Sequence, residues 1–145
     1  MTEAIIGACI EVHRHLGPGL LESAYEQCLC YELGLRGLAF ERQRSVPLRY
    51  KGVRLDCGYR ADVVVEERVL VELKTVEQLL PIHVAQTATY LRLSDLEVAL
   101  LVNFNVAALR RGLRRIDRTS LISPPSPISP FNDTATRALR RPEGT

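Results

Sequence analysis

The stretch RADVVVEERVLVELK, residues 60–74, carries the pattern that decides the fold. Two runs of β-branched and aliphatic residues flank the polar triplet at 66–68, which predicts two strands joined by a short turn. Three ionisable residues, Asp62, Glu72 and Lys74, interrupt these otherwise aliphatic runs. They are the first candidates for a chemical role, provided that the two strands bring them together.

The register of the two strands decides whether these side chains meet. Glu72 and Lys74 are two residues apart on one strand, so their side chains point to the same face. A loop centred on Glu67 pairs residues whose numbers sum to 134, which sets Asp62 opposite Glu72. It also sets Arg60 opposite Lys74, with directly opposed Cβ atoms about 4.5–5.5 Å apart. A turn shorter by one residue would point Asp62 to the other face.

Two carboxylates at this separation repel each other unless a cation lies between them. Hard oxygen ligands of this kind suit Mg²⁺ or Mn²⁺, and a neighbouring lysine can orient or deprotonate a metal-bound water. Only Lys51 and Lys74 among the 19 basic residues are lysines, so a lysine is not the default cation of this chain. The alternative is that Asp62, Glu72 and Lys74 form the solvated face of a half-exposed sheet.

Polar residues on two helical segments are expected near the same strand end. Gln86 and Tyr90 are four residues apart on the segment at 76–93 and so share one helical face. Glu22 interrupts the apolar face near the start of the segment at 20–33. Each residue alone is more typical of a satisfied surface or core-edge group, but together they favour a site.

Apolar periodicity elsewhere predicts the remaining elements. Spacing of three and four residues predicts helices at 2–16, 20–33 and 76–93. Alternation and short aliphatic runs predict a hairpin at 46–55 and strands at 59–65, 69–73, 98–104 and 109–116. The expected fold class is therefore α/β in the broad sense, an α+β arrangement in which helices flank a mixed β-sheet.

Overall composition is that of one ordinary globular domain. The chain has 145 residues, of which 46% are hydrophobic and 25% charged, with a net charge of +2. Its four cysteines form no CxxC pair and its N-terminus does not resemble a signal peptide, which predicts a cytoplasmic protein. No aliphatic run approaches the roughly 20 residues of a membrane span. We expect a domain at 1–118 and a disordered or draped Pro/Ser-rich tail at 119–145.

An arginine-rich stretch at 110–118 admits two interpretations. Arg111 and Arg114 within it could line a phosphate-binding surface, where each neutralised phosphate adds to affinity and to salt sensitivity. The same charges could instead guard an edge strand against aggregation.

Several motifs together resemble a known family. Residues 19–25 follow the pattern Gly-x-x-Glu-x-x-Tyr, residues 59–62 are Tyr-Arg-Ala-Asp, and residues 72–74 are Glu-Leu-Lys, with Gln86 on the helical segment that follows. This combination is similar to that of the GxxExxY protein family, within the PD-(D/E)XK nuclease superfamily. The resemblance covers residues 5–116, about three quarters of the chain.

The resemblance implies a core like that of the restriction endonucleases and a metal site within it. Asp62 and Glu72 would be ligands of Mg²⁺ or Mn²⁺, joined by the main-chain carbonyl of Leu73.

The resemblance also implies roles for residues around the metal. Lys74 would be catalytic, and Glu22 and Gln86 would support the site. Ala61 stands where the superfamily pattern has proline, at a position that supplies no ligand.

The resulting expectation is a metal-dependent nuclease that hydrolyses phosphodiester bonds of DNA or RNA. No membrane partner is expected, and a homodimer is one assembly that could bind a duplex. Four residues are expected to contact the substrate: Tyr90, Arg60, Arg111 and Arg114. The alternative is a non-catalytic nucleic-acid-binding or protein-interaction module that retains the nuclease fold.

Overall fold

The computed structural model describes residues 1–121, and residues 122–145 lie outside the described part. Its helices are α1 (Thr2–Leu16), α2 (Glu22–Leu35), α3 (Pro81–Leu93), α4 (Arg118–Leu121) and the short 3₁₀ helix η1 (Leu109–Gly112). Its strands are β1 (Phe40–Ser45), β2 (Leu48–Tyr50), β3 (Val53–Leu55), β4 (Arg60–Val65), β5 (Val69–Lys74), β6 (Val98–Asn103) and β7 (Leu113–Asp117).

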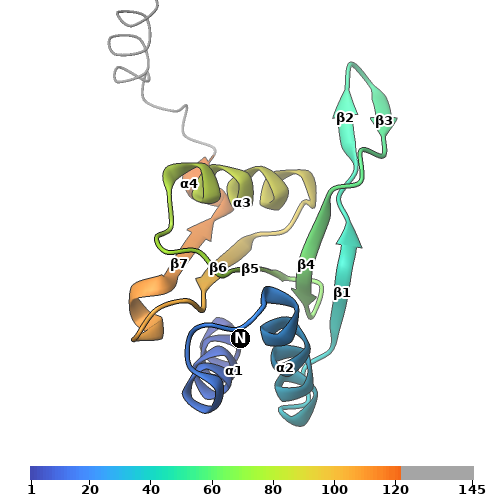
Figure 1. The fold of residues 1–145 in the computed structure, drawn as a ribbon. Helices are drawn as coiled ribbons and strands as arrows, with labels where there is room; N and C mark the ends of the chain where they lie inside the picture. The colour runs from blue at the N-terminus through green and yellow to red at the C-terminus, as the bar shows by residue number, and fades with distance from the viewer. Residues whose placement is uncertain (122–145) are drawn as a thin grey trace, which may run out of the picture.

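Five of these strands form one mixed sheet in the order β1-β4-β5-β6-β7. β5 and β6 run parallel, since α3 makes the crossover between them, and the other neighbours are antiparallel. β2 and β3 form a separate two-stranded sheet, which extends beyond the body of the molecule (Figure 1). The predicted mixed sheet flanked by helices is confirmed.

Helices cover both faces of the main sheet, with α1 and α2 on one side and α3 on the other (Figure 1). Ile5 and Leu29 pack in the layer under α1 and α2, together with Val71 of β5. The next residue back along β5, Leu70, packs in the other layer with Leu91 of α3. Because β5 is buried on both faces, its aliphatic run is continuous rather than alternating.

Most predicted elements are confirmed, but some of their ends differ. The helix expected at 20–33 is α2, and the strands expected at 59–73 are β4 and β5. The helix expected at 76–93 begins only at Pro81, because proline suits the first helical turn and disfavours helix before it. The first half of the strand expected at 109–116 is η1 instead.

β1 has no counterpart among the predicted strands. Its sequence FERQRS presents no apolar face, and nearly all of its side chains are exposed at the edge of the sheet. Pairing with β4 forms it, through partners such as Arg44 and Ala61. Charged residues suit an edge strand because they discourage pairing with another chain.

The segment expected to be a tail begins inside a short helix. The helix α4 includes residues 119–121, the first three of that segment. The proline- and serine-rich remainder lies outside the described residues.

The register predicted for the β4–β5 hairpin is confirmed. Val63 pairs with Val71 and Val65 with Val69, so paired numbers sum to 134. The predicted partnership of Arg60 with Lys74 is wrong: the β4–β5 pairing ends at Val63. Beyond this pair, β4 remains paired with β1 and β5 remains paired with β6, while β4 and β5 separate from each other.

Candidate functional site

The candidate site lies where β4 and β5 separate. The main-chain N–H of Asp62 donates to Glu72 Oε1 at 3.0 Å, and the N–H of Leu73 donates to Asp62 Oδ2 at 2.8 Å. Side-chain carboxylates therefore replace main-chain carbonyls as acceptors at the point of separation. The same two hydrogen bonds hold the Asp62 and Glu72 side chains beside each other.

Burial and repulsion raise the pKa of both carboxyls. The pKa of Glu72 is raised to about 8, first by burial and then by the negative charge of Asp62. Burial also raises the pKa of Asp62, and the charge of Glu26 adds to this effect. The N–H of Leu73 lowers the pKa of Asp62, and the ammonium of Lys74 lowers the pKa of both carboxyls. A cation bound between the two carboxyls would therefore favour their charged forms.

Glu22 joins this cluster from the first turn of α2. Burial raises its pKa, the negative charge of Asp62 adds to the effect, and Lys74 opposes it. The ammonium of Lys74 therefore lies within electrostatic reach of all three carboxyls, those of Glu22, Asp62 and Glu72. The sequence pattern placed these four residues near one another, and the structure brings them together.

Tyr25 fixes the loop that carries Glu22 into the site. Its hydroxyl donates to the carbonyl of Gly17 and accepts a hydrogen bond from the N–H of Leu20 at 3.2 Å. Its ring stacks on Phe104 with centroids 4.5 Å apart. The Gly-x-x-Glu-x-x-Tyr pattern thus contains an anchoring tyrosine one turn after the acidic residue that it helps to position.

Two residues of the site were not predicted from the sequence. Gln43 of β1 donates to Asp62 Oδ1 at 3.3 Å and to Glu26 Oε1 at 2.9 Å. Glu26 is almost fully buried, one turn after Glu22 on the same face of α2. The signal available for Glu26 was its spacing of four residues from Glu22. Gln43 gave no such signal, because it belongs to the strand that the sequence did not reveal.

Gln86 approaches the carboxylates through Tyr90. Its side-chain amide donates to the Tyr90 hydroxyl at 3.2 Å, and the Tyr90 ring packs against Tyr59 with centroids 5.8 Å apart. Burial raises the pKa of Tyr90, and the nearby charges of Glu72 and Asp62 contribute to the same direction. Tyr90 therefore lies within electrostatic reach of the carboxylate pair, and Gln86 is bonded to its hydroxyl.

The sequence as a whole was compared with known proteins. A family model described as PD-(D/E)XK nuclease superfamily matches residues 1–116. The chain belongs to the PD-(D/E)XK nuclease superfamily. A search of curated proteins and a search of solved structures found no match. Membership implies a nucleic-acid substrate.

No helix in residues 1–121 combines the length and the apolar character needed to cross a membrane.

The arginines expected to bind substrate occupy different places in this PD-(D/E)XK domain. Arg60 is exposed at the start of β4, two residues before Asp62. Arg111 lies in η1, and Arg114 in β7 donates to the carbonyls of Arg111 and Leu113. β6 lies between β7 and β5, and Arg114 pairs with Leu101, which pairs with Glu72. Contact of these arginines with a substrate stays a prediction.

Superfamily members generally use divalent metal ions, and the donor set of this site fits one. Among the described residues, no three or more His, Cys, Asp or Glu side chains form a group suited to hold a metal. The fit rests instead on two carboxylates, Asp62 and Glu72, with the carbonyl of Leu73 between them in sequence. Carboxylate and carbonyl oxygens are hard donors, which match the preferences of Mg²⁺ and Mn²⁺.

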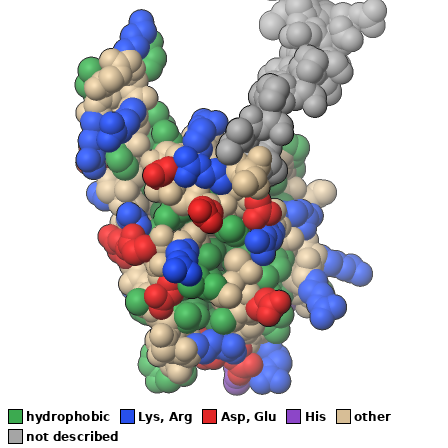
Figure 2. Space-filling view, turned by 180° about the vertical axis from the view of Figure 1, so that it is seen from behind, with side chains coloured by type: hydrophobic (Ala, Val, Ile, Leu, Met, Phe, Trp, Pro, Cys, Tyr) green, Lys and Arg blue, Asp and Glu red, His purple; other side chains and the backbone are tan. Residues whose placement is uncertain are grey.

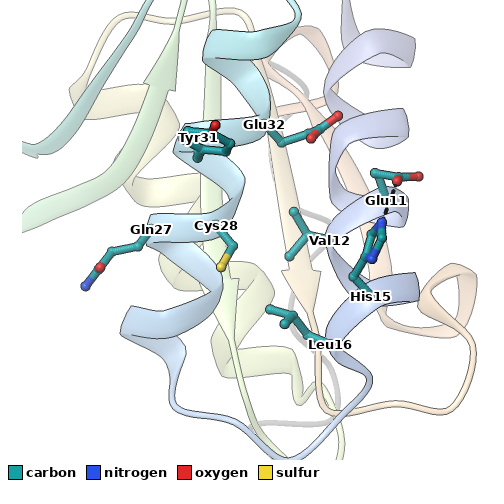
Figure 3. Close-up of a pocket in the computed structure, with 8 residues that line it drawn as sticks. All are labelled: Glu11, Val12, His15, Leu16, Gln27, Cys28, Tyr31 and Glu32. Atoms are coloured by element: carbon teal, nitrogen blue, oxygen red, sulfur yellow. Dashed lines mark hydrogen bonds and ion pairs between the residues drawn. The ribbon is translucent and has the colours of Figure 1, made fainter.

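A separate groove lies between α1 and α2, with a volume of about 280 Å³. Val12 and Leu16 line it from α1, and Cys28 and Tyr31 from α2 (Figure 3). Tyr31 is nine residues after Glu22, or two and a half helical turns, and so lies on the opposite face of α2. The groove is therefore distinct from the carboxylate site.

Proposed function

We propose that this protein is a metal-dependent nuclease that hydrolyses phosphodiester bonds in nucleic acid. The observation that carries the proposal is the convergence of Asp62 and Glu72 where β4 and β5 separate, with Lys74 close to both. Membership of the superfamily supports the same reaction class.

Asp62, Glu72 and the Leu73 carbonyl would hold the metal ion. When bound, Mg²⁺ or Mn²⁺ supplies Lewis-acid stabilisation of a phosphodiester and lowers the pKa of water. The chain's own contribution is positional, since the N–H groups of Asp62 and Leu73 fix the orientation of the two carboxylates. Asp62 is fixed further by the amide of Gln43.

Lys74 would act on the reacting groups directly. Its ammonium can stabilise negative charge that grows on the phosphate, and its amine form can accept the proton of the attacking water. Glu22 and Gln86 would act as supports, Glu22 through its charge beside Lys74 and Gln86 through Tyr90.

We also propose that the chain belongs to the GxxExxY proteins within the superfamily. The pattern at 19–25 supports this assignment, because Tyr25 anchors the loop that precedes Glu22. The domain would comprise 1–118 and the tail 119–145.

The direct test is cleavage of end-labelled single- and double-stranded DNA and RNA by the purified protein. Products should form with Mg²⁺ or Mn²⁺ and disappear with EDTA. Glu72→Gln should abolish them, whereas Glu77→Gln should not, because Glu77 is an exposed residue outside the site. Absence of metal-stimulated cleavage of every substrate would refute the proposal.

One observation favours the alternative, a binding module without catalysis. Asp62 and Glu72 each accept a main-chain hydrogen bond, so the pair stabilises the sheet even without a metal. In that case the protein would show no metal-stimulated cleavage and would bind nucleic acid with an affinity insensitive to Lys74→Met. The described residues do not support the expected homodimer, which stays a prediction for sedimentation velocity with and without a DNA duplex.

A further inference from the structure

The strands β2 and β3 form a projecting ribbon, here named the β2–β3 arm and comprising residues 48–55 (Figure 1). Its register pairs Leu48 with Leu55, Arg49 with Arg54, and Tyr50 with Val53. The turn at its tip uses Lys51 and Gly52, both with positive φ, which matches the twist of a tight hairpin. The arm thus has a defined structure although it lies outside both hydrophobic cores.

One face of the arm is purely basic. Arg49 and Arg54 are directly opposed and therefore point to the same side of the ribbon. Neither guanidinium has a hydrogen-bond or ion-pair partner within the described residues, and like charges directly opposed destabilise a strand pair. Lys51 adds a third cation at the tip, and residues 48–55 contain no Asp or Glu. An external polyanion would neutralise these charges.

The surface view agrees with this charge count. Figure 2 shows Lys and Arg side chains gathered on the part of the molecule that projects beyond the rest. A local concentration of one sign of charge steers oppositely charged partners, even though the net charge of the chain is only +2.

The arm is attached to the strand that carries the candidate site. The N–H of Val46 donates to the carbonyl of Tyr59 at 2.9 Å, so hydrogen bonding continues from β1 and β4 to the base of the arm. Leu55 precedes Asp62 by seven residues, which span at most about 25 Å. One turn of a DNA duplex is about 34 Å long, so a duplex at the carboxylates can also reach the arm.

The shape of the arm selects among nucleic acids. The major groove of B-form DNA is about 12 Å wide and admits a two-stranded β-ribbon. The major groove of A-form RNA is deep and too narrow for side chains to read, and a single strand offers no groove. The arm also lacks the row of aromatic residues on which single-stranded bases stack, since Tyr50 is its one aromatic residue.

We propose that the β2–β3 arm binds the major groove of duplex DNA through Arg49 and Arg54, which makes duplex DNA the substrate class of the site. The assignment of a substrate class rests on the proposed nuclease function, whereas DNA binding by the arm does not.

The opposite, apolar face of the arm suggests a different partner, a second copy of the chain. Tyr50 and Val53 are paired on that face with exposed fractions of 61% and 55%. If a second copy of the chain covered this apolar face, the arm would be a contact between subunits. Val53→Thr would then shift the protein toward monomer in sedimentation velocity, and Arg49 and Arg54 would have no effect on DNA binding.

The test measures fluorescence anisotropy of three labelled probes in EDTA, which prevents metal-dependent cleavage. The probes are a 24-base-pair DNA duplex, an RNA duplex of the same length and a 24-nucleotide single DNA strand. The full chain is compared with the double variant Arg49→Gln/Arg54→Gln. The matched control is Arg14→Gln/Arg36→Gln, which removes two arginines paired with glutamates on α1 and after α2.

If Arg49 and Arg54 each neutralise a phosphate along the groove, their loss should lower the salt slope of duplex DNA binding by about 1.8. The wild-type to variant affinity ratio should then be about tenfold larger at 50 mM than at 200 mM salt. The RNA duplex, the single strand and the control variant should show no comparable change. Circular dichroism should give an unchanged melting temperature, and Lys51→Gln, with a slope change of about 0.9, supplies a second variant should the double one misfold.

An unchanged salt slope, or an equal change with the RNA duplex or the control, would overturn the assignment of the arm. This failure is distinct from failure of the nuclease proposal. Cleavage without an effect of the arm variant would support the nuclease proposal and refute DNA binding by the arm. An effect of the arm variant without any metal-stimulated cleavage would support DNA binding by the arm and refute the nuclease proposal.

Discussion

Two hairpins of this protein each place two like charges beside each other, one pair buried in the protein and the other exposed to solvent. In the β4–β5 hairpin, Asp62 and Glu72 are negative and mostly buried. In the β2–β3 arm, Arg49 and Arg54 are positive and exposed. Burial forces the carboxylates to respond, and the pKa of Glu72 rises to about 8. For the exposed arginines, solvent instead screens the repulsion between the two positive charges.

The difference shows how surroundings decide which counterion a like-charge pair can take. A buried pair of carboxylates leaves room for one small, hard cation whose ligands are already oriented. An exposed pair of guanidinium groups on a ribbon suits an extended polyanion. The following predictions test whether the two hairpins differ in this way.

The largest expected effect belongs to the buried hairpin. Lys74→Met should lower the single-turnover cleavage rate by about 10²–10⁴-fold, because the interaction of Lys74 is made chiefly in the transition state. Affinity for the DNA duplex should change by less than about threefold. Lys74→Arg retains a charge but cannot accept a proton, so recovery of the rate in this variant would assign Lys74 to charge stabilisation. A loss confined to affinity would contradict the catalytic role.

The next effect concerns stability without metal. A carboxyl whose pKa is raised in the folded state stabilises the protein below its unfolded pKa, and this contribution is lost as pH rises through the folded value. For Glu72 this window runs from 4.5 to about 8. In EDTA, Glu72→Gln should therefore melt several degrees above wild type at pH 8.5 and close to it at pH 4. Differential scanning calorimetry measures this.

The matched control for this comparison is Glu77→Gln, whose melting temperature should track that of wild type at both pH values. Mg²⁺ at pH 8.5 should raise the melting temperature of wild type and leave that of Glu72→Gln unchanged, because only wild type keeps the complete ligand set. A constant difference between Glu72→Gln and wild type at both pH values would show that ionisation of Glu72 is not its cause.

A smaller effect tests the dependence of the buried hairpin on its neighbours. Tyr25→Phe removes the hydroxyl that bonds to Gly17 and Leu20 but retains the ring stacked on Phe104. We expect a loss of about 1–3 kcal/mol of unfolding free energy in urea titrations. We also expect slower cleavage, since Glu22 loses its fixed loop. Full cleavage activity in Tyr25→Phe would show that the Tyr25 hydroxyl is not needed to position Glu22.

The smallest effect belongs to the exposed hairpin. Arg49→Gln relieves a screened repulsion in water and should change the unfolding free energy by no more than about 0.5 kcal/mol. The same urea titrations measure it. A loss of more than about 1 kcal/mol of unfolding free energy, twice the expected limit, would mean that Arg49 has a structural partner.

The sequence predicted the β4–β5 hairpin well because local rules govern it. The three-residue polar turn at 66–68 and the aliphatic runs on either side determine the register, so the meeting of Asp62 with Glu72 followed from counting. The same counting failed for Arg60 and Lys74. Where the pairing of β4 with β5 ends, β4 stays paired with β1 and β5 with β6.

Residues fixed by long-range pairing escaped prediction. β1 has no apolar period, so Gln43 could not be placed beside Asp62 from its own surroundings. Only the pairing of β1 with β4 brings it there. The helical site residue Glu22 was predicted because it interrupts the apolar face of its own helical segment, whereas the stacking of Tyr25 on Phe104 joins residues far apart along the chain.

The hydrogen bonds between the separating strands limit which substitutions of the two carboxylates preserve the fold. Asp62 and Glu72 are acceptors for two main-chain N–H groups. Replacement by alanine would leave these groups without a partner, at a cost of about 1–3 kcal/mol each. Asparagine and glutamine keep an oxygen in the same place and lose only the charge. A descendant that abandoned chemistry but retained the fold would therefore be expected to pass through the amides, and a library of variants selected for folding alone should be enriched in them at both positions.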